Sequence, residues 1–126
     1  TYGDLGLHEI LNLGVWWGEL TGGLPLPLGG NVVRRDLGDE LVQRVARLLR
    51  SSIEYSLEHR EEALDYALQF GRGLARDQAD RFVGMYVNQL TVDYGERGRR
   101  AVRTLLERAH ERRLVPEVPR LDFVTG

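Results

Sequence analysis

The sequence predicts an α/β chain in which a short strand-helix-strand unit is followed by about four helices. In the first 36 residues the apolar side chains alternate or form short runs, and these runs are broken by glycine and proline. Such a pattern is typical of strands and turns. From residue 37 onward the apolar side chains recur every three or four positions, which indicates helices with one buried face. A length of 126 residues is that of one domain.

The predicted strand-helix-strand unit begins with a strand over residues 7–13, where apolar and polar residues partly alternate between two glycines. A short helix follows over residues 15–21 and is predicted to end at Gly22 and Gly23. Residues 24–28 read Leu-Pro-Leu-Pro-Leu. Prolines at alternate positions remove backbone donors and fix φ, so this run must be extended. Residues 30–35 are predicted as the second strand.

The helical part contains four periodic stretches, and most of them are preceded by an aspartate that could cap the helix. The first stretch predicts a helix of about 20 residues. The stretches are residues 41–56, 63–70, 79–90 and 98–109. The expected caps are Asp36 with Asp39, Asp77 with Asp80, and Asp93 with Glu96. Pro116 and Pro119 prevent further extension, and residues 121–124 are predicted as a terminal strand.

The composition excludes several classes of chemistry. There is no cysteine, so the sequence offers neither disulfides nor thiolate ligands. All 17 basic residues are arginines, which removes Schiff-base catalysis and a phosphate-loop lysine. A net charge of −2 argues against nucleic acid as the main partner. No apolar run approaches the roughly 18 residues of a membrane span, so no membrane partner is expected.

None of the three histidines is expected to be catalytic. His8 and its neighbour Glu9 would point to opposite faces of the first predicted strand. His59 and His110 lie among glutamates and arginines in helical stretches, a pattern that indicates solvated surface. No histidine or carboxylate spacing suggests a zinc site, so no metal is predicted.

The candidate binding site is the turn that follows the proline-rich run, formed by Pro27, Leu28, Gly29, Gly30 and Asn31. Glycines allow a sharp turn or a close approach of the backbone to another group. Asn31 offers both a donor and an acceptor, so the turn could bind a carboxylate. The alternative is a hinge between two parts of the chain. Trp16 and Trp17 are more consistent with packing than with stacking on a planar ligand.

Two long stretches carry a family resemblance. Residues 14–36 contain Trp-Trp, then Leu-Pro-Leu-Pro-Leu-Gly-Gly, then Val-Arg-Arg-Asp, and residues 81–98 read RFVGMYVNQLTVDYGERG. On these stretches the chain resembles the 1,4-dihydroxy-6-naphthoate synthases of the futalosine route to menaquinone. The sister chorismate dehydratases look less similar in the Leu-Pro-Leu-Pro-Leu-Gly-Gly run.

The resemblance implies a two-lobed fold like that of the type II periplasmic-binding proteins, with a ligand cleft between the lobes. Residues 1–28 would finish the smaller lobe, 29–36 would be a return crossing strand, and 37–126 would form helical cover of the larger lobe. Family members are about twice as long as this chain. Their proposed catalytic histidine lies in a His-Glu-Gly segment just upstream of the equivalent of Thr1. The chain is therefore expected to be a C-terminal half.

The resemblance also implies a function. The complete protein would be a cytoplasmic lyase that converts cyclic dehypoxanthinylfutalosine to 1,4-dihydroxy-6-naphthoate without a cofactor. Its expected partners are the small-molecule substrate and the missing N-terminal half, with a homodimer as a further possibility. The alternatives are a non-catalytic solute-binding module of the same fold, a chorismate dehydratase, and a stand-alone helical interaction domain.

Overall fold

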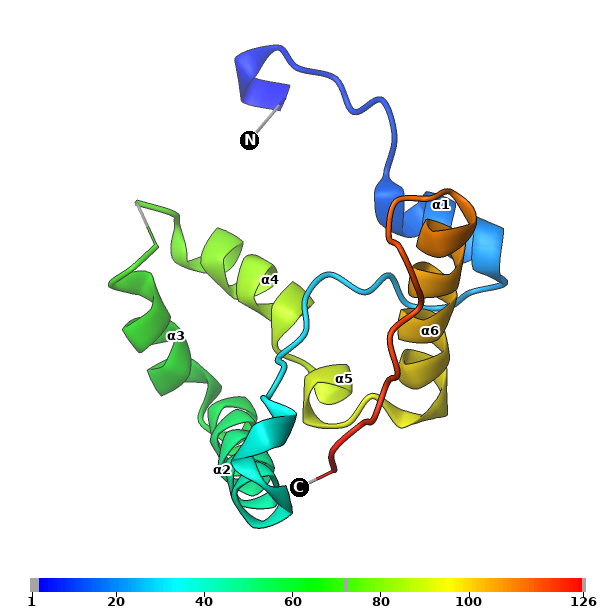
Figure 1. Ribbon diagram of the computed structural model, residues 1–126. Coiled ribbons are helices and arrows are strands. Elements are labelled where there is room, and N and C mark those ends of the chain that lie inside the picture. The colour runs from blue at the N-terminus through cyan, green and yellow to red at the C-terminus, as the bar shows by residue number, and fades with distance from the viewer. Residues whose placement is uncertain (1–2, 72, 126) are drawn as a thin grey trace. The chain divides into compact units, whose positions relative to one another are not determined.

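The computed structural model describes residues 3–71 and 73–125 (Figure 1). Most of them are helical, and they divide into two compact units that each draw on two segments of the chain. Unit 1 comprises residues 1–27 and 96–118, and unit 2 comprises residues 28–95 and 119–126. The lobe boundaries implied by the resemblance stay a prediction, as does the two-lobed fold itself.

Unit 1 contains the short 3₁₀ helix η1 (Gly3–Leu5), the helix α1 (Leu13–Thr21) and nearly all of α6 (Gly95–Glu111). The side chain of Asn12 caps α1, because its Oδ1 accepts hydrogen bonds from the backbone of Gly14 and Val15 at 3.1 and 3.2 Å. Gly22 ends the helix in the left-handed conformation, at φ 68°. The helix predicted over residues 15–21 is thus confirmed and is two residues longer.

Trp17 is the largest buried side chain of unit 1, and only 2% of its surface is exposed. Its indole Nε1 donates to the carbonyl oxygen of Pro25 at 3.0 Å, which ties the proline-rich run back onto α1. Arg97 at the start of α6 donates from Nη2 to the carbonyl oxygen of Gly23 at 2.7 Å. The remaining buried apolar side chains of this unit are those of Leu24 and Ala101.

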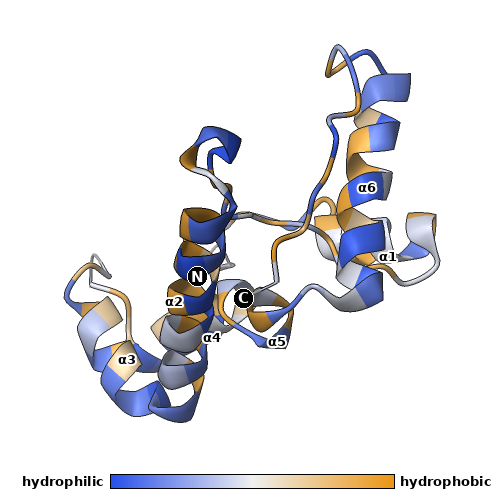
Figure 2. Cartoon of the chain, turned by 60° about the horizontal axis from the view of Figure 1, so that its bottom comes forward, coloured by the Kyte–Doolittle hydropathy of each residue, from blue (hydrophilic) through white to orange (hydrophobic). Residues whose placement is uncertain are grey.

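Unit 2 is built around α2 (Asp39–Glu58), an amphipathic helix that carries both apolar and polar residues along its length (Figure 2). The other elements are η2 (Arg35–Leu37), α3 (Arg60–Leu68), α4 (Arg76–Tyr86) and α5 (Gln89–Val92). α2 contacts α3, α5 and η2, and α3 contacts α4. The buried side chains are Leu64 on α3 and Ala79 on α4, so the core of this unit is small.

Two arginines join α3 to α4. Arg60 donates from Nε to Oδ1 of Asp80 at 2.8 Å and from Nη2 to the carbonyl oxygen of the same residue at 2.9 Å. Arg76 is paired with both Glu61 and Asp65 on α3. These pairs are partly or largely exposed, so they fix the orientation of the two helices more than they stabilise the fold.

The predicted strands are wrong for the described residues. Residues 7–13, 30–35 and 121–124 contain no strand: Leu13 opens α1, Arg35 lies in η2, and the rest is irregular chain. A strand requires the backbone of a neighbour to complete its hydrogen-bond ladder, and no such neighbour is present in the described part of the chain. The helical half of the predicted α/β fold class is confirmed, whereas its strand-helix-strand unit is not observed.

Two of the predicted caps are also wrong. α2 begins after Gly38, and Asp36 pairs with Arg34 instead. α4 begins after Ala75, with Asp77 inside its first turn. Asp93 does accept a hydrogen bond from the Gly95 backbone, at 2.6 Å, next to the start of α6. An aspartate near a helix start can pair with a nearby arginine as readily as with the helix, and the sequence does not decide between them.

The third periodic stretch, predicted as one helix over residues 79–90, is broken into α4 and α5. The break falls at Val87 and Asn88, where the backbone is extended. Asn88 caps α5 through a reciprocal capping box with Thr91. The apolar periodicity continues across the break, and this is why the pattern alone predicted a single helix.

Candidate functional site

The predicted binding turn begins where the chain leaves unit 1. Pro27 is the last residue of unit 1, and it is half-buried. Leu28, Gly29, Gly30 and Asn31 open unit 2 and are exposed. The side chain of Asn31 is therefore accessible to solvent. The structure therefore brings four of the five predicted residues together on the exposed start of unit 2. Their role in binding stays a prediction.

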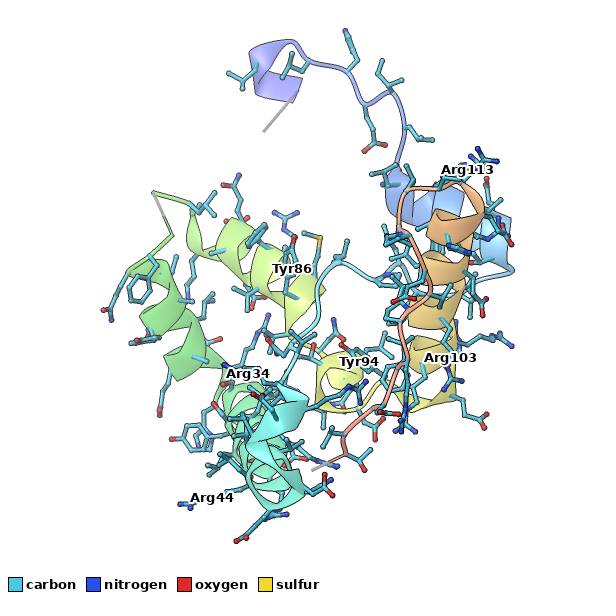
Figure 3. All side chains as sticks on the ribbon, in the orientation of Figure 1. Arg34, Arg44, Tyr86, Tyr94, Arg103 and Arg113 are labelled. Atoms are coloured by element: carbon cyan, nitrogen blue, oxygen red, sulfur yellow. The ribbon has the colours of Figure 1, made fainter. Side chains whose placement is uncertain are left out.

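Gly30 is the member of this turn with a close neighbour. A Cβ atom added at Gly30 would lie 3.2 Å from the hydroxyl oxygen of Tyr94, tighter than most real contacts, whereas one added at Gly29 would meet nothing within 4 Å. Neither glycine has a positive φ. Space for a side chain at position 30 is therefore limited by Tyr94, and not by a left-handed backbone. Tyr94 lies between α5 and α6 in sequence and is labelled in Figure 3.

The arginine pair that follows the turn is fixed by two aspartates. Arg34 donates from Nε to Asp36 at 2.9 Å, and this hydrogen bond lowers the pKa of the Asp36 carboxyl. Arg35 is paired with Asp122 and also donates from Nη2 to the carbonyl oxygen of Arg120 at 2.8 Å. The hydrogen bond from Arg35 lowers the pKa of Asp122 as well. Arg34 therefore pairs within its own segment, whereas Arg35 connects this segment to residues 120–122.

The second motif, residues 81–98, comprises the end of α4, the whole of α5 and the start of α6. Asn88 donates from Nδ2 to the carbonyl oxygens of Gly84 and Met85 at 3.1 and 3.3 Å and accepts from the Leu90 backbone at 3.0 Å. Thr91 donates to the carbonyl oxygen of Tyr86 at 2.7 Å. This hydrogen-bond network fixes the turn that carries Tyr94. Tyr94, near the end of this motif, lies close to Gly30 of the candidate site.

The structure gives two of the three histidines structural contacts. His59 stacks on Tyr55 with ring centroids 3.9 Å apart, and its Nδ1 lies 3.0 Å from the Tyr55 carbonyl oxygen. The Nδ1 atom of His110 lies 3.3 Å from the carbonyl oxygen of Val115. His8 is exposed on irregular chain. Within the described residues no three His, Cys, Asp or Glu side chains gather as metal ligands.

Two hollows of the surface lie in unit 2, away from the predicted turn. One has a volume of about 340 Å³ and lies at the start of α2, between Leu37 and Arg44. The other, of about 210 Å³, lies among α2, α3 and α4 and is mostly apolar, with Ser52, Ser56 and Arg60 as its polar members. Because Arg60 donates a hydrogen bond to Asp80, we interpret this groove as part of the packing of the three helices.

Comparison with known proteins identifies the family. The profile of a family described as menaquinone biosynthesis matches residues 1–111. The chain belongs to this family.

None of the described helices is long and apolar enough to cross a membrane.

Two curated relatives in this menaquinone-biosynthesis family carry the same name. The chain is 44% identical to a 1,4-dihydroxy-6-naphtoate synthase of Thermus thermophilus over 124 residues, which cover 98% of this chain and 45% of the relative. It is 39% identical to the protein of that name from Streptomyces coelicolor over 116 residues, which cover 92% of this chain and 41% of the relative. The chain spans less than half the length of these relatives.

The family relationship extends to a solved structure. A crystal structure of a protein from Archaeoglobus fulgidus superimposes with a TM-score of 0.84 at 43% sequence identity. The match covers 91% of this chain and 43% of that chain. The helical arrangement of this part of the family is therefore shared with a solved relative.

The sequence missed the residues that surround the turn. Tyr94 approaches Gly30 from 64 positions away in sequence, and Asp122 pairs with Arg35 from 87 positions away, so these contacts exist only in the folded chain. The signal that could have pointed to Tyr94 was its place in the second motif, as the tyrosine of the Asp-Tyr-Gly run.

Proposed function

We propose that this chain forms part of a cofactor-independent lyase that converts cyclic dehypoxanthinylfutalosine to 1,4-dihydroxy-6-naphthoate. The observation that carries the proposal is the 44% identity to a 1,4-dihydroxy-6-naphtoate synthase across 98% of the chain. A second relative of the same name supports it at 39% identity. The chain would contribute a binding surface at Gly29, Gly30 and Asn31, whose exposed amides could hold a carboxylate of the substrate.

The complete enzyme would also need a general base, which the described residues do not supply in a convincing form. Two histidines contact backbone carbonyl oxygens, and the third lies exposed on irregular chain. A general base must lie within hydrogen-bond reach of the proton that it removes and must be held in a defined place. We therefore assign the base to the part of the fold that corresponds to the remainder of the relatives.

The partner of this chain would accordingly be the remaining part of the fold. The matched relatives are more than twice as long as the matched region. Several large apolar side chains near the start of the chain are exposed, namely Leu5, Leu7, Ile10, Leu11 and Leu13, and so is Val32. Extended apolar chain without a neighbour is a template for strand pairing. We infer that the rest of the fold, on the same polypeptide or on another, pairs with these segments.

A chimaera tests the proposed function. The segment of the Thermus thermophilus relative that precedes the matched region would be joined to residues 1–126 of this chain. We expect turnover of cyclic dehypoxanthinylfutalosine by the chimaera, measured by the appearance of 1,4-dihydroxy-6-naphthoate, and none by either part alone. A chimaera that folds without turnover would contradict the function. Turnover by residues 1–126 alone would show that one of His8, His59 or His110 is the base after all.

The binding role of the turn is tested with Asn31→Ala in the same chimaera. The variant should lose a hydrogen bond worth on the order of 0.5–1.5 kcal/mol, or up to 3 if the partner is a carboxylate. The melting temperature should hardly change, since Asn31 is exposed. Substrate affinity by calorimetry and melting by circular dichroism are the two measurements.

Gln43→Ala is the matched control for Asn31→Ala, because Gln43 also carries an exposed amide side chain in unit 2 and lies outside the turn. It should change neither affinity nor melting. If Asn31→Ala instead lowers the melting temperature and leaves affinity intact, Asn31 is a structural turn residue and the assigned binding role is wrong.

A further inference from the structure

The crossing segment, residues 28–36, is held by the segment that follows Pro119. Arg35 is paired with Asp122 and donates to the carbonyl oxygen of Arg120, and Arg120 in turn donates from Nε to Asp122 at 3.1 Å. All of these residues belong to unit 2. Two ends of the unit that are more than 80 residues apart in sequence are therefore joined beside the predicted binding turn.

Tyr94 forms a second connection between the same two segments. Its ring meets that of Phe123 edge-to-face, with centroids 5.7 Å apart and planes at 82°. A Cβ atom added at Gly30 would lie 3.2 Å from the Tyr94 hydroxyl oxygen. Both rings are half-buried. An edge-to-face pair has a defined geometry, so Phe123 restrains the ring that supports Gly30.

We propose that Tyr94 is a positioning residue. Held by Phe123, it supports the backbone at Gly30 and thereby sets the direction in which Asn31 is presented to the substrate. The part of this inference that concerns substrate rests on the proposed function, whereas the support of the turn by Tyr94 can be tested without any substrate.

The substrate-free test uses the absence of cysteine from the chain. A single cysteine at Val32, which is 98% exposed, would carry a nitroxide spin label whose spectrum reports the mobility of the crossing segment. Tyr94→Ala should increase the mobile component of the spectrum. Tyr66→Ala is the matched control, because Tyr66 lies in the same unit and makes a similar edge contact, with Phe70 at 5.4 Å. It should leave the spectrum unchanged.

Two results of the label experiment would overturn the proposal. One is a spectrum that Tyr94→Ala does not change. The other is a label that is already fully mobile in the parent chain, since the segment would then be positioned by nothing.

The functional readout is the split between KM and kcat in the chimaera described above. Tyr94→Ala should raise KM about tenfold, equivalent to about 1.4 kcal/mol of binding, with kcat little changed, since a misdirected turn loses ground-state and transition-state contacts alike. Tyr66→Ala should leave both constants unchanged. An unchanged KM in Tyr94→Ala would contradict the positioning role. If the parent chimaera shows no turnover, the proposed function fails, and the label experiment still decides on Tyr94.

A pair of small substitutions tests the contact itself. Gly30→Ala places a methyl group 3.2 Å from the Tyr94 hydroxyl oxygen, so it should displace the turn and raise KM. Tyr94→Phe removes that oxygen while keeping the ring against Phe123. In the double variant KM should return toward the parent value, because residues in direct contact do not act additively. If the two effects simply add, the two residues do not contact each other and the proposal is wrong.

Discussion

Replacing Trp17 with alanine is expected to unfold much of unit 1, at a cost of about 3–5 kcal/mol. Trp17 is 2% exposed, and the other buried apolar side chains of its unit, Leu24 and Ala101, are smaller. The substitution also leaves the carbonyl oxygen of Pro25 without its indole donor. Since whole domains are stable by only about 5–15 kcal/mol, a loss of this size removes most of the stability of so small a core.

Urea denaturation followed by far-ultraviolet circular dichroism measures this effect. Trp16→Ala is the matched control, because Trp16 is the neighbouring residue of the same type and is 45% exposed. It should cost distinctly less than Trp17→Ala. Trp17→Phe should fall in between, because it retains most of the apolar surface and loses the hydrogen bond, worth about 1 kcal/mol. A Trp16→Ala cost equal to or above that of Trp17→Ala would show that the assigned core is wrong.

Residues 1–126 by themselves are expected to self-associate. Several large apolar side chains are strongly exposed, with Ile10 at 94% and Val32 at 98%. Large exposed apolar surface and unpaired extended chain both drive association. Light scattering should therefore report dimers or larger species, and joining the rest of the fold should suppress them.

Ile10→Asp should reduce this association, because a charge on extended apolar chain opposes strand pairing. Gln43→Asp is the matched control, since it adds the same charge at an exposed position of α2 that is already polar. It should have little effect. A monodisperse monomer of the parent chain with one cooperative thermal transition would contradict the expectation and would show that the chain is a self-contained domain.

The helices could be predicted from the sequence because their apolar periodicity is local. The stripe from Leu41 to Ser56 lies within α2, and the stripe from Gly98 to Ala109 lies within α6. The end of α1 at Gly22 was predicted as well, since a glycine in the left-handed conformation is a local signal. Helix boundaries that depend on competing side chains, such as Asp36 with Arg34, were not predictable in the same way.

The strands could not be predicted reliably, because a strand forms only when the backbone of a second segment pairs with it. Residues 7–13 and 30–35 have the composition of strands, yet they find no backbone partner within the described residues. The candidate site was likewise predictable only where its signal is local. The turn at Gly29, Gly30 and Asn31 was visible as a local motif, whereas its contact with Tyr94 joins residues 64 positions apart.

The interleaving of the two units has a consequence for the order in which the chain folds during its synthesis. α2, α3, α4 and α5 lie consecutively in sequence, so their contacts can form while the chain is still being made. Unit 1 forms later, because the hydrogen bond from Arg97 to Gly23 needs 74 more residues to be synthesised after Gly23. The pairing of Arg35 with Asp122 comes later still. Such distant contacts form slowly, so the crossing segment is among the last parts of the chain to be fixed on the ribosome.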